Sequence, residues 1–86
     1  MKTIFNESYN LLIECLKKER KKRNLTQAQL ASLIGRDQTY VSKYERCEKR
    51  LDVIEVRTIC LALGIEFTKF ISDFENLLKK KGYEDE

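Results

Sequence analysis

The sequence predicts an all-α fold, and three observations lead to this prediction. Proline is absent and glycine occurs only at Gly35, Gly64 and Gly82, so few residues interrupt helices. Apolar residues recur three and four positions apart, which is the periodicity of a helix rather than of a strand. The length of 86 residues and the hydrophobic content of 42% suit one small core. We therefore expect residues 1–86 to form a single compact domain.

The first expected helix covers residues 6–22 and gives the domain an N-terminal helical extension. Its inward positions would be Tyr9, Leu12, Ile13 and Leu16. A second, shorter helix begins after Thr26, a good capping residue, and ends at Gly35. The apolar residues at helical spacing in this second helix are Ala28, Leu30, Ala31, Leu33 and Ile34.

A third helix begins two residues after Gly35, because Asp37 is well suited to cap it. Val41 and Tyr44 would face inward. The outward residues would then be Gln38, Thr39, Tyr40, Ser42 and Lys43. These side chains can hydrogen-bond base edges in the major groove of DNA, which is wide enough to admit a helix. Residues 26–45 are thus two short helices joined by a tight turn, an arrangement that predicts DNA reading.

A fourth helix is expected over about residues 52–63, with Gly64 ending it. Its inward positions would be Val56, Ile59, Cys60 and Leu63.

The fifth helix, over about residues 67–81, is amphipathic and carries the longest apolar stripe of the chain. The stripe consists of Phe67, Phe70, Ile71, Phe74, Leu77 and Leu78. So large a strip on a small domain usually marks an interface, and we expect a dimer interface made of Phe70, Phe74, Leu77 and Leu78. The alternative is that the stripe packs on the first helix through Ile4, Phe5 and Tyr9. Both arrangements can hold at once.

Basic residues cluster on both sides of the two-helix motif, although the net charge is only +3. One cluster spans residues 17–23, and the other consists of Arg46, Lys49 and Arg50. For most lysines of the first cluster, a solvated helix face is the better interpretation.

Several classes of protein are excluded by what the sequence lacks. It contains neither an apolar run of membrane-spanning length nor a signal-peptide pattern, so we expect a cytoplasmic protein without membrane association. Cys15, Cys47 and Cys60 have no CxxC spacing and no histidine beside them, so neither disulfides nor a metal site is expected. We also expect no cofactor and no enzymatic activity, because residues for acid–base or nucleophilic catalysis are not recognisable.

An ordered set of residues resembles the lambda-repressor-like helix-turn-helix family, also called the Cro or xenobiotic-response-element (XRE) type. The resemblance covers about residues 12–70. It is carried by Leu12, Leu16 and Arg20, and by the segments LTQAQLA (25–31), Gly35, VSKYE (41–45), LDV (51–53) and LALGI (61–65). The resemblance implies a five-helix domain that binds double-stranded DNA as a dimer, with the second motif helix in the major groove.

The resemblance also implies roles for individual residues. Base-reading positions would be Gln38, Thr39, Tyr40 and Lys43, although Tyr40 could equally pack against the sugar-phosphate backbone. Phosphate contacts would come from Gln27, Arg36, Ser42, Arg46, Lys49 and Arg50. Arg20 and Glu45 would form a structural salt bridge. Relatives usually have glycine where this chain has Asn24 and Cys47, each placed after a helix in a left-handed conformation.

These observations predict a homodimeric transcriptional regulator that occupies a two-fold symmetric operator, with repression as the default. Controller proteins of restriction-modification systems, small phage repressors and antitoxins resemble it about equally. The alternative is a protein-interaction module, or an antitoxin, whose C-terminal helix captures a protein partner. The basic flanks and the acid-free outward face argue against that alternative.

Overall fold

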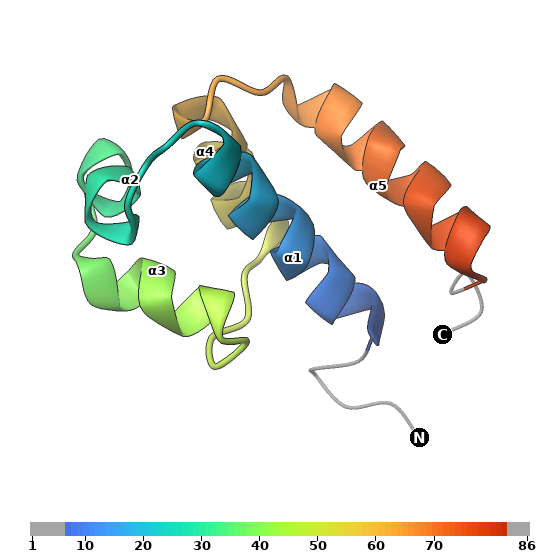
Figure 1. Cartoon of the computed structure of the whole chain (residues 1–86), viewed down its shortest axis with the longest axis horizontal. Helices are drawn as coiled ribbons and strands as arrows, with labels where there is room; N and C mark the ends of the chain where they lie inside the picture. The colour runs from blue at the N-terminus through green and yellow to red at the C-terminus, as the bar shows by residue number, and fades with distance from the viewer. Residues whose placement is uncertain (1–6, 83–86) are drawn as a thin grey trace.

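Residues 7–82 are described by a computed structural model, in which they form five helices and no strand. The helices are α1 (Glu7–Lys22), α2 (Gln27–Leu33), α3 (Gln38–Glu45), α4 (Val53–Ala62) and α5 (Phe67–Lys81). In Figure 1, α2 and α3 lie on one side of α1 and α5 lies on the other. The all-α prediction is confirmed. The expected contributions of Ile4 and Phe5 fall outside the described residues.

Local hydrogen bonds explain where the short helices begin. The Thr26 hydroxyl accepts from the Gln29 N–H at 3.0 Å, and the Gln29 side chain accepts from the Thr26 N–H at 2.9 Å, which forms a capping box. Asp37 caps α3 by accepting from the Tyr40 N–H at 3.3 Å. Between the two helices, Gly35 has a φ of +70°, a conformation that glycine adopts without a steric penalty.

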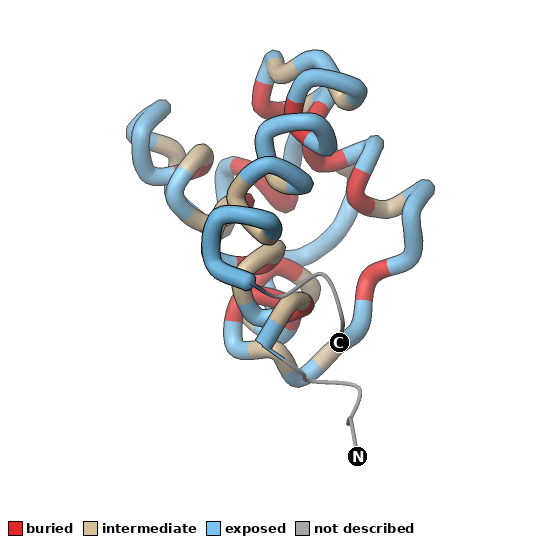
Figure 2. The backbone as a smooth tube through the Cα atoms, turned by 90° about the vertical axis from the view of Figure 1, so that its right-hand side faces the viewer, coloured by how far each residue is buried: buried red, intermediate tan, exposed pale blue. Residues whose placement is uncertain are grey.

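The core lies between α1 and the four other helices, with its buried positions turned to the inside of the bundle (Figure 2). The largest fully buried side chains are Tyr44, Ile13, Leu16, Leu30, Ile59, Val41 and Cys60. Val41 and Tyr44 are both 0% exposed, so the inward face predicted for α3 is confirmed. This burial fixes which face of α3 remains exposed.

The apolar stripe of α5 divides between the core and a groove. Phe70 is only 6% exposed and belongs to the core, because α5 packs on α4 and α1 where Phe70 closes the bundle. Its expected place in a dimer interface remains a prediction, and this burial leaves it little surface for such a contact. Phe74, Leu77 and Leu78 are half-buried. Phe74 and Leu77 line a groove of about 530 Å³ that α1 residues also line.

Among the described helices, none is both long and apolar enough to cross a lipid bilayer.

Candidate nucleic-acid interface

The outward face of α3 is the centre of the candidate interface. Gln38, Thr39 and Lys43 are exposed on it, while Val41 and Tyr44 anchor the opposite face in the core. None of the three exposed side chains is acidic. The helix therefore offers amide, hydroxyl and ammonium groups to a surface that carries hydrogen-bonding groups and negative charge.

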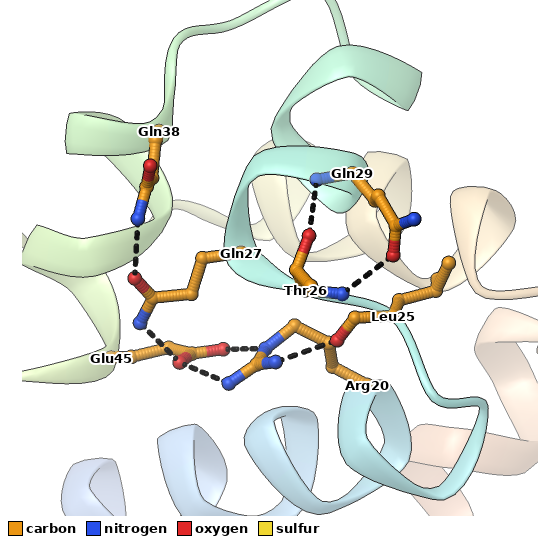
Figure 3. A network of polar contacts seen from close by, with 7 residues as sticks. All are labelled: Arg20, Leu25, Thr26, Gln27, Gln29, Gln38 and Glu45. Carbon is orange, nitrogen blue, oxygen red and sulfur yellow. Dashed lines mark hydrogen bonds and ion pairs between the residues drawn. The ribbon is translucent and has the colours of Figure 1, made fainter.

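A buried ion pair fixes the far end of this helix to α1. Arg20 Nε donates to Glu45 Oε2 at 2.7 Å and Arg20 Nη2 donates to Glu45 Oε1 at 2.9 Å, a two-point contact between groups only 7% and 8% exposed (Figure 3). Arg20 Nη1 also donates to the Leu25 carbonyl at 2.7 Å, which ties the loop before α2 to the same guanidinium. The structure thus contains the pair that the resemblance implies, joining the end of α1 to the end of α3.

Gln27 connects that ion pair to the start of α3. Its Nε2 donates to Glu45 Oε1 at 2.9 Å, and its Oε1 accepts from Gln38 Nε2 at 3.4 Å (Figure 3). The predicted phosphate contact of Gln27 remains a prediction. Gln27 also orients the amide of Gln38, which is the group expected to read a base.

Tyr40 is less exposed than Gln38, Thr39 and Lys43 on the same helix. It is half-buried, and its hydroxyl donates to Glu55 Oε2 at 2.9 Å. Its ring packs edge-to-face on Tyr44, with the centroids 5.8 Å apart, and the Arg36 guanidinium lies 4.5 Å from its centroid. Burial, followed by the hydrogen bond to Glu55, raises the pKa of Tyr40. A base-reading role for Tyr40 is untested, and these contacts favour a supporting role instead.

Four of the six residues expected to meet phosphates, namely Ser42, Arg46, Lys49 and Arg50, lie at the end of α3 and in the loop after it. Arg46 donates to the Ser42 hydroxyl and forms an ion pair with Glu48 at 3.0 Å. Lys49 Nζ lies 3.2 Å from Glu55 Oε2, while the Arg50 guanidinium lies 4.6 Å from the centroid of the Tyr9 ring. Positive charge is therefore present in this loop, but carboxylates partly balance it.

Two residues that hold this loop in place, Tyr9 and Glu55, were not predicted to do so from the sequence. Tyr9 accepts from the Leu51 N–H at 3.0 Å and donates to the Lys49 carbonyl at 3.1 Å, which ties the loop to α1. Glu55 accepts from the Asp52 N–H at 2.9 Å as part of the capping box of α4. The capping pattern Asp-x-x-Glu was a visible signal for Glu55, but its contacts with Tyr40 and Lys49 depend on tertiary packing.

The two positions where relatives usually have glycine adopt left-handed backbone. Asn24 has a φ of +57° and Cys47 a φ of +60°. Cys47 is half-buried, and its burial, followed by the nearby Glu14 carboxylate, raises the pKa of its thiol. This thiol therefore lacks the lowered pKa that makes a cysteine reactive.

Comparison with known proteins agrees with this geometry. A family model described as helix-turn-helix (HTH_3) matches residues 16–70, more than half of the chain. Among solved structures, the chain is similar to an XRE-family like protein from Pseudomonas syringae pv. tomato str. DC3000. That pair has 38% sequence identity and a TM-score of 0.80, and the match covers 86% of this chain and 90% of the other.

A second solved structure, the clp gene regulator ClgR from Corynebacterium glutamicum, is similar in fold alone. Its TM-score is 0.74 at 19% identity, with 93% of this chain and 85% of that chain covered. No curated protein gives a significant sequence match.

Proposed function

The chain belongs to the helix-turn-helix family, and from that premise we propose that it binds a two-fold symmetric DNA operator as a homodimer and represses transcription. Membership of this family, of the XRE type, makes the chain a DNA-binding transcriptional regulator. The symmetric operator, the dimer and the repression are the proposed parts.

The observation that carries the proposal is the way α3 is presented. Its exposed face holds Gln38, Thr39 and Lys43, and it is held by the core behind it and by the Arg20–Glu45 pair at its end. A side chain that reads a base must arrive in a defined position, because hydrogen bonds weaken steeply with poor geometry. An anchored helix with an exposed polar face meets that requirement.

In this proposal, base edges are read by Gln38, Thr39 and Lys43. The glutamine amide can pair with adenine and the lysine with guanine. Phosphates are contacted by residues around this face, namely Gln27, Arg36, Ser42, Arg46, Lys49 and Arg50. Tyr40 supports the helix from behind and packs beside the backbone of the DNA.

The homodimer is supported by apolar side chains of α5 that remain partly exposed in the single chain. Phe74, Leu77 and Leu78 follow the buried Phe70 along one side of the helix and remain half-exposed. A dimer formed there would carry two α3 helices, and a palindromic operator offers such a dimer two half-sites about one DNA turn apart.

Selection of bound duplexes from a random DNA pool, followed by sizing of the complex in solution, tests the proposal. We expect the enriched sequence to be a palindrome bound by two chains. Enrichment of a non-symmetric site bound by a single chain would contradict the dimer, and an absence of enrichment would contradict specific binding.

A further inference from the structure

Glu55 occupies a junction between three segments of the DNA-facing region. Its Oε1 accepts from the Asp52 N–H at 2.9 Å, at the start of α4. Its Oε2 accepts from the Tyr40 hydroxyl of α3 at 2.9 Å and lies 3.2 Å from Lys49 Nζ, in the loop between those helices. One carboxylate thus holds the reading helix, the basic loop and the next helix together.

The two side chains that Glu55 holds belong to the DNA-facing region and also contact each other, since Lys49 Nζ lies 5.4 Å from the centroid of the Tyr40 ring. Lys49 lies beside Arg50 in the basic loop, and Tyr40 lies on the helix that carries Gln38 and Lys43. The Glu55 side chain is only 20% exposed and the Lys49 side chain 34%, so the charge pair is partly shielded from solvent. Burial acts to raise the pKa of Glu55, but the hydrogen bond from the Asp52 N–H and then the contacts with Tyr40 and Lys49 outweigh it and lower that pKa, so the carboxylate stays charged at neutral pH.

We propose that Glu55 is a positioning residue that raises DNA specificity: it holds Tyr40, and with it α3, against α4, while its charge offsets that of Lys49 on every DNA sequence alike. The inference rests on the proposed function. A negative charge at the rim of a DNA-binding face weakens binding to every DNA sequence alike, whereas a fixed α3 is needed only to read the correct one. Only the fixed position of α3 therefore widens the difference between operator and random DNA, because the charge effect is the same on both.

Glu55→Gln isolates these effects with little change to the helix. Glutamine also completes a capping box, so its oxygen can still accept from the Asp52 N–H. Its amide nitrogen then replaces Oε2 and cannot accept from Tyr40 or Lys49. We expect thermal unfolding close to that of the wild type, while Tyr40 and Lys49 lose their acceptor.

The measurement compares dissociation constants for the selected duplex and a scrambled duplex of the same composition, over a range of salt. With Glu55→Gln, binding to the scrambled duplex should tighten by about fivefold at 0.15 M salt, the value of one added phosphate contact. The slope of log affinity against log salt should steepen by about one unit. The charge effect should be equal on the two duplexes, so the ratio of the two affinities should fall by about fivefold from the loss of the Tyr40 hydrogen bond alone, which matters only for operator binding.

Two further variants separate position from charge. Tyr40→Phe removes only the hydroxyl, so operator binding should weaken while scrambled binding and the salt slope stay unchanged. Glu48→Gln is the matched charge control, since the Glu48 side chain pairs with the exposed Arg46 at 3.0 Å and not with Tyr40 or Lys49. It should tighten binding to both duplexes equally and leave their ratio unchanged.

An unchanged affinity ratio in Glu55→Gln would overturn the inference, as would an equal fall of the ratio in Glu48→Gln. If Glu55→Gln fails to fold, Tyr40→Phe decides alone, and an unaltered ratio there overturns the positioning role. A wild-type protein that does not prefer the selected duplex would instead overturn the proposed function together with the inference.

Discussion

Breaking the Arg20–Glu45 pair should destabilise the protein far more than breaking an ion pair on its surface. Arg20→Met keeps most of the apolar stem but removes the guanidinium, which leaves the carboxylate of Glu45, itself only 8% exposed, without its charged partner. Loss of one partner of a buried pair costs about 3–5 kcal/mol. A domain of this size has a total unfolding free energy of about 4–13 kcal/mol, so the variant should approach the limit of folding.

Replacing both partners should be less damaging than replacing either one. In Arg20→Met/Glu45→Leu no charge is left buried, and the remaining losses are the donor to the Leu25 carbonyl and the acceptor for Gln27. At about 1 kcal/mol for each net hydrogen bond, the double variant should lose about 2 kcal/mol.

Urea unfolding followed by circular dichroism at 222 nm measures these differences. With a slope of about 1 kcal/mol per M, Arg20→Met should lower the midpoint by about 3 M or leave the chain unfolded without urea. Lys69→Met is the matched control, because Lys69 pairs with Asp73 at 3.3 Å while both side chains are more than half exposed, and it should lose less than about 1 kcal/mol. A loss below about 1 kcal/mol in Arg20→Met, or additive losses in the double variant, would refute this reasoning.

Four other substitutions test three further expectations. Tyr44→Phe should raise the unfolding free energy by about 1 kcal/mol, because the Tyr44 hydroxyl is buried and has no hydrogen-bond partner among the described residues; a clear loss in urea unfolding would reveal a partner for it. Cys47→Gly should leave the unfolding free energy unchanged or raise it by up to about 1 kcal/mol. It relieves a left-handed conformation that costs cysteine about 1–2 kcal/mol, but glycine loses more chain entropy on folding, which offsets part of that gain. Clear destabilisation would contradict this account of residue 47. Phe74→Arg and Leu78→Arg should each give a helical monomer that has lost most operator affinity, and an unchanged dimer in analytical ultracentrifugation would show that the stripe serves only to pack against α1.

Much of the fold could be predicted because local chemistry determines it. Thr26, Asp37 and Asp52 cap the N-termini of α2, α3 and α4. The apolar spacing of Val41 and Tyr44 identified the buried face of α3. Such features depend on neighbours within a few residues along the chain, so a single sequence contains the information. The left-handed conformation of Cys47 was instead implied by the family resemblance, in which glycine is usual at that position.

The rest depends on partners far apart in the sequence. Helical periodicity places Tyr40 on the outward face of α3, yet its hydroxyl meets a carboxylate 15 residues later, because the loop and the start of α4 fold back over it. Gln27 likewise pairs with Glu45, 18 residues away. Phe70 was expected at a dimer interface, and its burial within the chain could not be read from the stripe, because the stripe does not show how far α5 packs against the core. Periodicity identifies a face of a helix but not what covers that face.

The most direct test of base reading by α3 is the affinity of Gln38→Ala and Lys43→Ala for the selected duplex and for its scrambled counterpart. Both side chains are exposed, so their removal should leave the fold intact. We expect each variant to lose about 1–3 kcal/mol of binding free energy on the selected duplex, about 5- to 150-fold in affinity, with little change on the scrambled duplex. Equal losses on the two duplexes would show that these residues contact phosphates, and would contradict the assignment of the exposed face of α3 as the reader of the operator.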